Sequence, residues 1–392
     1  MDKVKNVPEV RFKDCGNAWF KDKLSELCDV RDGTHDSPTY LDSGYFFITS
    51  KNVKRGYINF EEIKFISKED YDNINKRSKV DVGDILFGMI GTIGNIAIVR
   101  KEPYYAIKNV ALIKDIRKLY NYFNYYYLQS PNIEKQLDNV LDGGTQKFIS
   151  LKSIRRLDII FPGCEEQTQI GNLFKNIDEK LELEKEKHEK LINFRKAMLE
   201  DMFPKEGKKV PKVRFDGFDD EWRYTALKNI LSSEKKGKAQ LSLLKSGKNL
   251  YLDADALNGN REFFCDVVPD VTKMDVLILW DGSKAGTVYS NIEGVLGSTL
   301  KSLTFNDSIN SYYVYSFLDS KKDTIFNYYR TPNIPHVVRN FTSSFEIPVP
   351  SPEEQALIGN FFKNLDEKIE LSEQKIAKIE NFKKAMLDKM FV

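Results

Sequence analysis

The chain contains one long segment twice, and this duplication constrains its fold more than any other feature. Residues 165–203 (EEQTQIGNLFKNIDEKLELEKEKHEKLINFRKAMLEDMF) and 353–391 (EEQALIGNFFKNLDEKIELSEQKIAKIENFKKAMLDKMF) align without a gap, and 24 of their 39 positions are identical. A shorter echo precedes each copy, because VPEVRF at 7–12 returns as VPKVRF at 210–215. A repeat of about half the chain is too long for the units of a solenoid. The sequence therefore predicts two similar halves, each made of two parts.

Four segments follow from this repeat. We expect a globular part over residues 1–160, a helical part over 161–207, a second globular part over 208–350 and a second helical part over 351–392. Within the globular parts, strand-like apolar runs alternate with Gly-rich turns and aromatic helical stretches, which indicates a mixed α/β fold. The two globular parts match each other poorly, so the protein keeps two similar scaffolds whose working surfaces differ.

The repeated segments predict two long helices with a coiled-coil seam. Neither copy contains proline, apolar residues recur in alternating steps of four and three, and dense Glu and Lys lie between them. The expected seam consists of Ile170, Phe174, Ile177, Leu181, Leu191, Met198, Ile358, Phe362, Leu365, Ile369, Ile376, Ile379 and Met386. Each helix could simply cap its own globular part. A pseudo-twofold antiparallel pair is the stronger interpretation, because it satisfies two equal seams at once.

The composition limits the classes of function. The net charge of +2 excludes a strongly basic coat protein for nucleic acid but leaves local DNA-binding patches open. No long apolar run or secretory signal is present, so no membrane span is expected. The four cysteines stand far apart and only three histidines occur, which disfavours a metal site and a disulfide framework and fits the cytoplasm.

Polar loops in the two globular parts supply the candidate DNA contacts. Arg and Lys side chains can read guanine, Asn and Gln can read adenine, and all of them can contact phosphate. We select Asp32, Thr34, His35, Lys51, Asn52, Gln146 and Lys147 in the first part, and Lys236, Lys238, Lys284 and Arg339 in the second. For each of these residues, an ordinary solvated loop position is the alternative. Tyr122, Tyr125 and Tyr126 could stack on bases, but we expect their helix to pack in the core.

Motifs for catalysis and for cofactor binding are missing from the sequence. It contains no GxxxxGK[ST] phosphate loop, no HExxH and no GxSxG, and the spaced glycines of GMIGTIGN at 88–95 suit a turn between strands. We therefore expect a chain that reads and assembles, with no catalytic residue and no cofactor of its own.

The duplicated unit resembles the specificity (S) subunit of type I restriction–modification enzymes. The resemblance rests on the twin EEQxxIGNxFKNxDEKxEL helices that end in FxKAMLxxMF and on the VPxVRF lead-ins, and it covers nearly the whole chain. The DGTH…P stretch at 32–38 also looks like a motif of the target recognition domains of that family. The second globular part lacks this stretch, so the two domains are expected to read different sequences.

The resemblance implies a DNA-binding subunit of a restriction system, in which each target recognition domain reads one half of a bipartite, asymmetric site. It implies that the coiled coil sets the spacer and docks two methyltransferase (M) subunits. These bring S-adenosylmethionine and flip an adenine for DNA methylation. Up to two restriction (R) subunits would join this core. Two other interpretations stay open: a scaffold that pairs two protein ligands without DNA, and a self-contained DNA-modifying enzyme.

Overall fold

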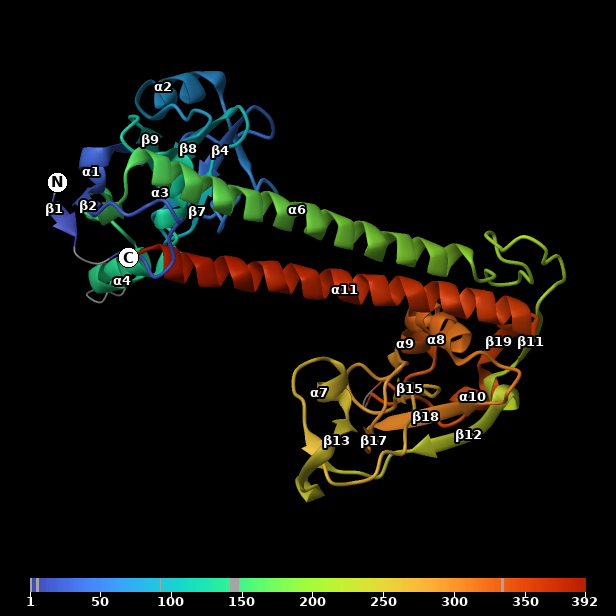
Figure 1. The fold of residues 1–392 in the computed structure, drawn as a ribbon. Helices are drawn as coiled ribbons and strands as arrows, with labels where there is room; N and C mark the ends of the chain where they lie inside the picture. Colours follow the sequence, from blue (N-terminus) through green and yellow to red (C-terminus); the bar gives the residue numbers. More distant parts are fainter. Residues whose placement is uncertain (1, 5–6, 92, 142–147, 333–334) are drawn as a thin grey trace. The chain divides into compact units, whose positions relative to one another are not determined.

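A computed structural model describes residues 2–4, 7–91, 93–141, 148–332 and 335–392 (Figure 1). Its contacts divide the chain into two units, Met1–Glu184 with Lys375–Val392 and Lys185–Gln374. Each unit holds one globular part, which we call a head, and a portion of each long helix. Both long helices therefore contribute to both units.

The first head is built on three small sheets. Their strand orders are β3-β9-β6-β7, β5-β4-β8 and β1-β2-β10. The strands are β1 (Asp2–Val4), β2 (Trp19–Lys23), β3 (Cys28–Asp32), β4 (Tyr45–Thr49), β5 (Lys64–Ile66), β6 (Ile85–Gly88), β7 (Ile96–Ile98), β8 (Tyr105–Lys108), β9 (Val110–Asp115) and β10 (Asp158–Phe161). The helices are α1 (Leu24–Leu27), α2 (Lys68–Ser78), α3 (Asn121–Tyr127), α4 (Pro131–Leu141) and α5 (Leu151–Arg155).

The second head also has three sheets, with the orders β12-β18-β15-β16, β14-β13-β17 and β11-β19. Its strands are β11 (Arg223–Ala226), β12 (Leu231–Lys236), β13 (Ser246–Leu252), β14 (Phe264–Cys265), β15 (Val276–Leu279), β16 (Val288–Tyr289), β17 (Val295–Leu296), β18 (Leu300–Phe305) and β19 (Glu346–Val349). Its helices are α7 (Ala254–Leu257), α8 (Ser311–Ser320), α9 (Lys322–Tyr328) and α10 (Phe341–Ser344), with short 3-10 turns at Leu227–Ile230 and Leu241–Leu243.

The two heads share one topology although their sequences match poorly. The four-stranded sheets have the same order once β12, β18, β15 and β16 replace β3, β9, β6 and β7. Each three-stranded sheet with a crossover contains one parallel pair, β4–β8 or β13–β17. Immediately before the central strands, the buried carboxylates of Asp84 and Asp275 each accept a 2.8 Å hydrogen bond from the backbone N–H three residues earlier. The mixed α/β fold predicted for both halves is confirmed.

The repeated segments form the two long helices, α6 (Cys164–Asp201) and α11 (Pro352–Met390). In the first unit they pack against each other. The rings of Phe174 and Phe391 stack with centroids 5.6 Å apart, and further along α6 the carboxylate of Asp178 pairs with Lys383 Nζ at 2.5 Å. Because rising numbers on α6 meet falling numbers on α11, the two segments run antiparallel.

The second unit repeats these contacts with the two helices exchanged. The rings of Phe362 and Phe203 stack at 5.8 Å, and Asp366 pairs with Arg195. Each of these residues lies 188 positions from its counterpart in the first unit, which is the offset of the sequence repeat. The equivalence shows that the two repeated segments run antiparallel within each unit and make matching contacts there.

The predicted seam positions alternate with exposed positions along both helices. Ile170, Phe174, Ile177, Ile358, Phe362 and Leu365 are buried, and Leu181, Leu191, Met198, Ile369, Ile376, Ile379 and Met386 are partly buried. Spacing by four and three residues keeps such positions on one stripe of the helix surface.

The lead-in motif before each head fastens that head to a long helix. Arg11 donates to both carboxylate oxygens of Glu166 at 2.8 and 2.7 Å, and Arg214 does the same to Glu354 at 2.7 and 2.9 Å. Both carboxylates are buried, and bidentate pairs of this kind fix orientation as well as charge. The repeated Arg of VPxVRF therefore has a structural role in each unit.

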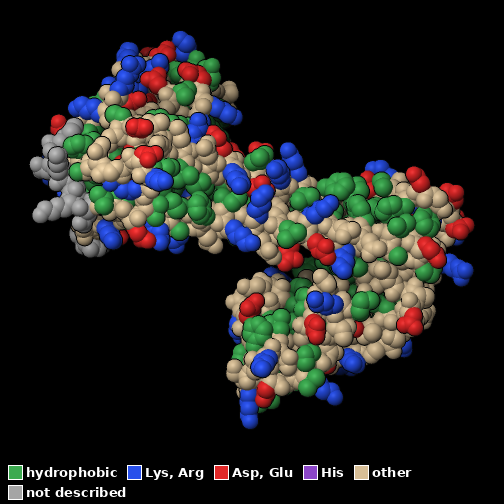
Figure 2. Space-filling view, in the orientation of Figure 1, with side chains coloured by type: hydrophobic (Ala, Val, Ile, Leu, Met, Phe, Trp, Pro, Cys, Tyr) green, Lys and Arg blue, Asp and Glu red, His purple; other side chains and the backbone are tan. Residues whose placement is uncertain are grey.

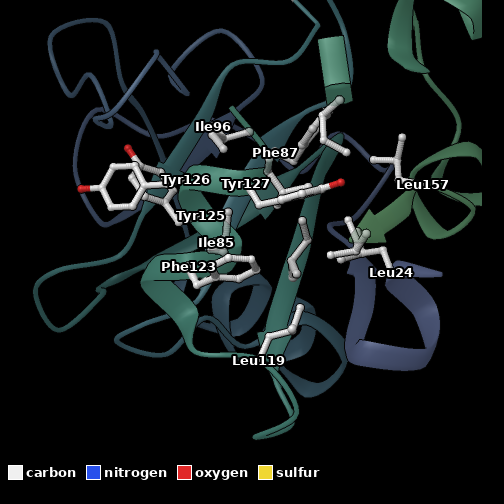
Figure 3. Close-up of a cluster of buried hydrophobic side chains, with 14 of the residues drawn as sticks. Leu24, Ile85, Phe87, Ile96, Leu119, Phe123, Tyr125, Tyr126, Tyr127 and Leu157 are labelled. Carbon is white, nitrogen blue, oxygen red and sulfur yellow. The ribbon is translucent and has the colours of Figure 1, made fainter. Parts of the chain in front are cut away.

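The aromatic helix α3 packs in the core of the first head, as expected (Figure 3). The side chains of Tyr125, Tyr126 and Tyr127 are fully buried, and Tyr126 Oη donates to the carboxylate of Asp178 on α6 at 2.8 Å. Gly171 allows α6 to lie close to the start of α3, since a Cβ there would lie 2.6 Å from the ring of Tyr120.

Candidate nucleic-acid interface

Strand β3 ends in a tight turn that carries the DGTH residues. Its backbone is held by two hydrogen bonds of 3.0 Å, from Gly33 N to Val110 O and from Thr34 N to Ile107 O. A Cβ on Gly33 would lie 2.3 Å from the oxygen of Ile107, so this approach requires glycine. The turn is thus fixed against the corner between β8 and β9.

The buried carboxylate of Asp32 gathers two basic side chains at this turn. Its Oδ2 lies 2.9 Å from His35 Nε2, and its Oδ1 accepts from Arg77 at the end of α2. The other ring nitrogen of His35, Nδ1, lies 2.8 Å from Asn109 Oδ1. The side chains of His35 and Arg77 are 58% and 70% exposed, against 10% for Asp32, so the basic groups face solvent.

These contacts favour the protonated form of the imidazole. The hydrogen bond with Asn109, then that with Asp32, raises the pKa of His35 above its ordinary value, against smaller lowerings by partial burial and by Arg77. Figure 2 shows basic and acidic side chains gathered over the part of the first head where Figure 1 places α2. We name Asp32, His35, Arg77 and Asn109 the Asp32 cluster.

A hollow of about 830 Å³ adjoins the Asp32 cluster, and Asn109 lines both. Its charged lining residues are Lys51, Lys54, Lys64, Lys108, Glu61 and Glu62. Four lysines against two glutamates give the hollow a positive excess, which suits a polyanionic backbone.

The side chain of Asn52 is buried, whereas a side chain that contacts a base must reach the surface. Its side chain is 7% exposed. Its Oδ1 accepts from Thr49 N and Oγ1 at 3.0 and 2.8 Å, and its Nδ2 donates to Asn59 O at 3.1 Å. The amide is therefore used inside the loop, where it shapes the segment that carries Lys51.

The second head has an equivalent glycine at the end of the equivalent strand, with different side chains around it. Gly237 N donates to Leu300 O at 3.0 Å, and a Cβ on Gly237 would lie 2.0 Å from Gly297 O. The strand registers place Lys236 opposite Lys301 as they place Asp32 opposite Ala111. Lys236 therefore stands where the first head has a carboxylate, and Lys238 follows the glycine as Thr34 does.

The charges at this turn are reversed between the heads. Lys236 Nζ donates to Asp281 Oδ2 at 2.9 Å, so the basic group lies on the strand and the acidic group opposite. Lys236 and Lys238 also line a hollow of about 590 Å³. Lys284 Nζ donates to Asn258 Oδ1 at 3.0 Å. Lys238 and Arg339 are exposed, and neither bonds to another residue within the described ranges.

Sequence reasoning missed three basic residues at the first head's turn and hollow: Arg77, Lys64 and Lys108. No local pattern marks them, because they come from α2, β5 and β8 and meet the DGTH turn only through the tertiary fold. The predicted residues Gln146 and Lys147 lie outside the described part of the chain.

The described part of the chain has neither a metal-binding cluster nor a membrane-spanning helix. Across residues 7–91, 93–141, 148–332 and 335–392, no group of three or more His, Cys, Asp or Glu is arranged to hold a metal ion. None of the helices described has the length and hydropathy that crossing a membrane requires.

Known proteins match this chain over both heads and the long helices. A family model for the type I restriction modification DNA specificity domain matches residues 17–193 and 219–381. The putative type I restriction enzyme MjaX specificity subunit of Methanocaldococcus jannaschii is 22% identical over 98% of this chain and 96% of that protein. The MjaVIII specificity subunit of the same organism is 31% identical over 31% of this chain, and the match spans 29% of its own length. The type I restriction-modification S subunit from M. genitalium has a crystal structure that matches with a TM-score of 0.70, at 18% identity over 99% of both chains.

The chain has the fold of the M. genitalium subunit, with two mixed α/β heads and two long helices. The two family-model matches cover most of the chain, so the chain belongs to the type I restriction modification DNA specificity domain family. Its role is recognition of DNA sequence for a type I restriction–modification system. The comparisons do not support the DNA-independent scaffold or the self-contained enzyme.

Proposed function

We propose that the chain is the non-catalytic specificity subunit of its complex and that each head reads one half of a bipartite, asymmetric DNA sequence. One observation carries the proposal: the turns at Gly33 and Gly237 leave equivalent strands through an equivalent glycine and carry different side chains. Side chains at base edges read sequence, whereas backbone contacts fix register. Two heads with one topology and unlike turns are therefore suited to two different half-sites.

The two turns and their hollows are the proposed contact surfaces. In the first head we assign Asp32, Thr34, His35, Lys51, Gln146 and Lys147, with Asn52 as a residue that shapes the loop. In the second head we assign Lys236, Lys238, Lys284 and Arg339. One bidentate base contact is worth about 1–3 kcal/mol of discrimination. Contacts with phosphate instead weaken binding to all sequences equally when removed.

We assign the spacing of the half-sites to the long helices. Helix α6 has 38 residues and α11 has 39, and each runs without a break from one unit into the other. Inserting one heptad into both helices keeps the seam in phase and adds about 10 Å, which is roughly three base pairs. The methylated motif should then gain about three spacer positions while both half-sites stay the same. Loss of either half-site would contradict this assignment.

We further propose that two methyltransferase subunits dock on the long helices. Leu183 and Phe194 on α6 are 49% and 47% exposed, and their counterparts Leu371 and Phe382 on α11 are 63% and 52% exposed. Eleven residues make about three turns, so each pair lies on one helix face. Exposed apolar pairs that recur at equivalent positions fit a partner that binds twice. The partners would bring the methyl donor, and restriction subunits would join them in the cytoplasm.

Native mass spectrometry of the co-expressed subunits tests the docking sites. Phe194→Glu and Phe382→Glu should each lose one methyltransferase copy, and the double variant should lose both. Lys196→Glu is the matched control, because it is exposed on the same helix but points away from the apolar face. A full complement of partners on the double variant would exclude this surface.

Methylome sequencing tests the function as a whole. A host that carries the chain should show one asymmetric bipartite motif, and the motif should vanish when the chain is removed. Methylation by the purified chain alone, with methyl donor and duplex, would contradict the non-catalytic assignment. A motif that persists without the chain would contradict its role as the reader.

A further inference from the structure

The Asp32 cluster contains one carboxylate and two basic side chains. Asp32 contacts His35 through Oδ2 and Arg77 through Oδ1. With a neutral imidazole the cluster carries no net charge, and with a protonated one it carries +1. A single proton therefore decides whether this exposed corner attracts an anion.

The geometry supports a protonated imidazole. Both ring nitrogens of His35 lie within 2.9 Å of a side-chain oxygen, Asn109 Oδ1 on one side and Asp32 Oδ2 on the other. A neutral imidazole donates from one nitrogen only, whereas an imidazolium donates from both. Arg77 uses one terminal nitrogen on Asp32, which leaves further N–H donors of its exposed guanidinium facing solvent.

We propose that Asp32, His35 and Arg77 form a proton-gated site for one phosphate of the DNA backbone. Protonation of His35 compensates Asp32 and leaves the charge of Arg77 available to the phosphate. His35 acts here as a positioning residue, and Arg77 makes the contact. This inference rests on the proposed DNA-reading function and adds a linkage between proton and phosphate binding to it.

Other charged groups lie beside the cluster. From β3, Arg31 donates to the backbone oxygen of Arg77 at 3.2 Å while its guanidinium pairs with Asp29. From α2, Asp70 lines the same small hollow as Arg77, and from the turn itself Asp36 does so. From β8, Lys108 borders the larger hollow and bonds to Ser37 Oγ. These two carboxylates and one lysine do not complete the coordination of Arg77, so an incoming phosphate has a guanidinium to bind.

In the second head a lysine takes the place of the Asp32 carboxylate. The residue in register with Asp32 is Lys236, and the turn continues through Gly237 and Lys238 to Ala239. The linkage should therefore belong to the first head alone, and it should appear once per chain.

The direction of the pH effect follows from linkage. Contacts with Asn109 and Asp32 raise the pKa of His35 above 6.5 in the free protein, and a bound phosphate raises it further. Affinity for DNA should be highest below the pKa of His35 in the free protein. It should fall as the pH rises towards the pKa of His35 in the bound protein, and it should level off above that value. A further rise of about one unit on binding corresponds to roughly a tenfold loss of affinity across this window.

Fluorescence anisotropy of the full chain with a labelled duplex of random sequence measures this effect, because a phosphate contact does not require the cognate site. Wild type should weaken by roughly tenfold from acidic to alkaline pH. His35→Gln should keep the weak, alkaline affinity at every pH, and Arg77→Gln should bind weakly throughout. His188→Gln, on α6 and outside both turns, is the control and should keep the wild-type profile. A His35→Gln profile that parallels wild type would overturn the inference.

A second measurement needs no substitution in the binding site. The chain has three histidines, so their ¹³Cε1 signals can be titrated by NMR with and without the duplex. The signal absent from His35→Gln should show a higher pKa when the duplex is present, and an unchanged pKa would refute the gating. Absence of salt-dependent duplex binding at any pH would instead refute the proposed function itself, so the two failures are distinguishable.

Discussion

Replacing Phe174 with alanine should destabilise the first unit by about 3–5 kcal/mol. The side chain of Phe174 is fully buried, and its ring contacts those of Tyr126 and Phe391 at centroid distances of 5.1 and 5.6 Å. Losing the buried area costs about 1.5–3 kcal/mol. Each ring contact adds about 0.5–1.5 kcal/mol. The sum agrees with the range expected for a large-to-small change that leaves a cavity.

Urea unfolding followed by tryptophan fluorescence provides the assay. Trp19 is fully buried in the same core cluster as Phe174, so in a Trp222→Phe, Trp280→Phe background, which removes the two tryptophans of the second head, its emission reports on the first unit. Phe382→Ala, at an exposed position on α11 in the same unit, is the matched control and should change the free energy of unfolding by less than about 1 kcal/mol. If the two variants lost equal stability, the packing of α6 against α11 would not have the energetic role assigned to it.

Three further predictions concern charge and thiol chemistry. Arg195→Met leaves Asp366 without its ion pair in a partly buried position and should destabilise the second unit by about 3 kcal/mol, measured by urea unfolding; a smaller loss than that of an exposed Lys→Met change would contradict this. Folding raises the pKa of His35, so His35 should stabilise the protein relative to His35→Gln. This difference in the free energy of unfolding should be complete below pH 6.5 and disappear as the pH rises through the raised pKa. A difference that widens with pH would refute the assignment. Burial raises the pKa of Cys28 to about 12, so Ellman's reagent at mildly alkaline pH should modify exposed Cys164 first and Cys28 only after unfolding.

The duplicated helices could be predicted from the sequence because their signal is local and regular. A seam repeated every seven residues, without proline, predicted helices over 165–203 and 353–391, and the structure has them at Cys164–Asp201 and Pro352–Met390. The contacts that join each lead-in motif to its helix, Arg11–Glu166 and Arg214–Glu354, could be found only in the structure.

The surfaces of the heads could be predicted only in part, because their neighbours come from distant segments. The sequences RDGTH and KKGKA share one glycine, and nothing in them shows that both end the same strand of the same sheet. Arg77 follows Asp32 by 45 residues, and only the packing of α2 brings them together. Asn52 looked like a base reader because amides can read adenine, but its burial and bonds depend on a loop whose shape the sequence does not state.

Exchange of one head is the most direct test of independent reading by the two halves. Residues 1–160 would be replaced by the corresponding head of another family member, and the methylome of the host would be sequenced. We expect a motif with one new half-site, one original half-site and the original spacer. A change in both half-sites, or a new half-site that appears only when the second head is also replaced, would contradict independent reading.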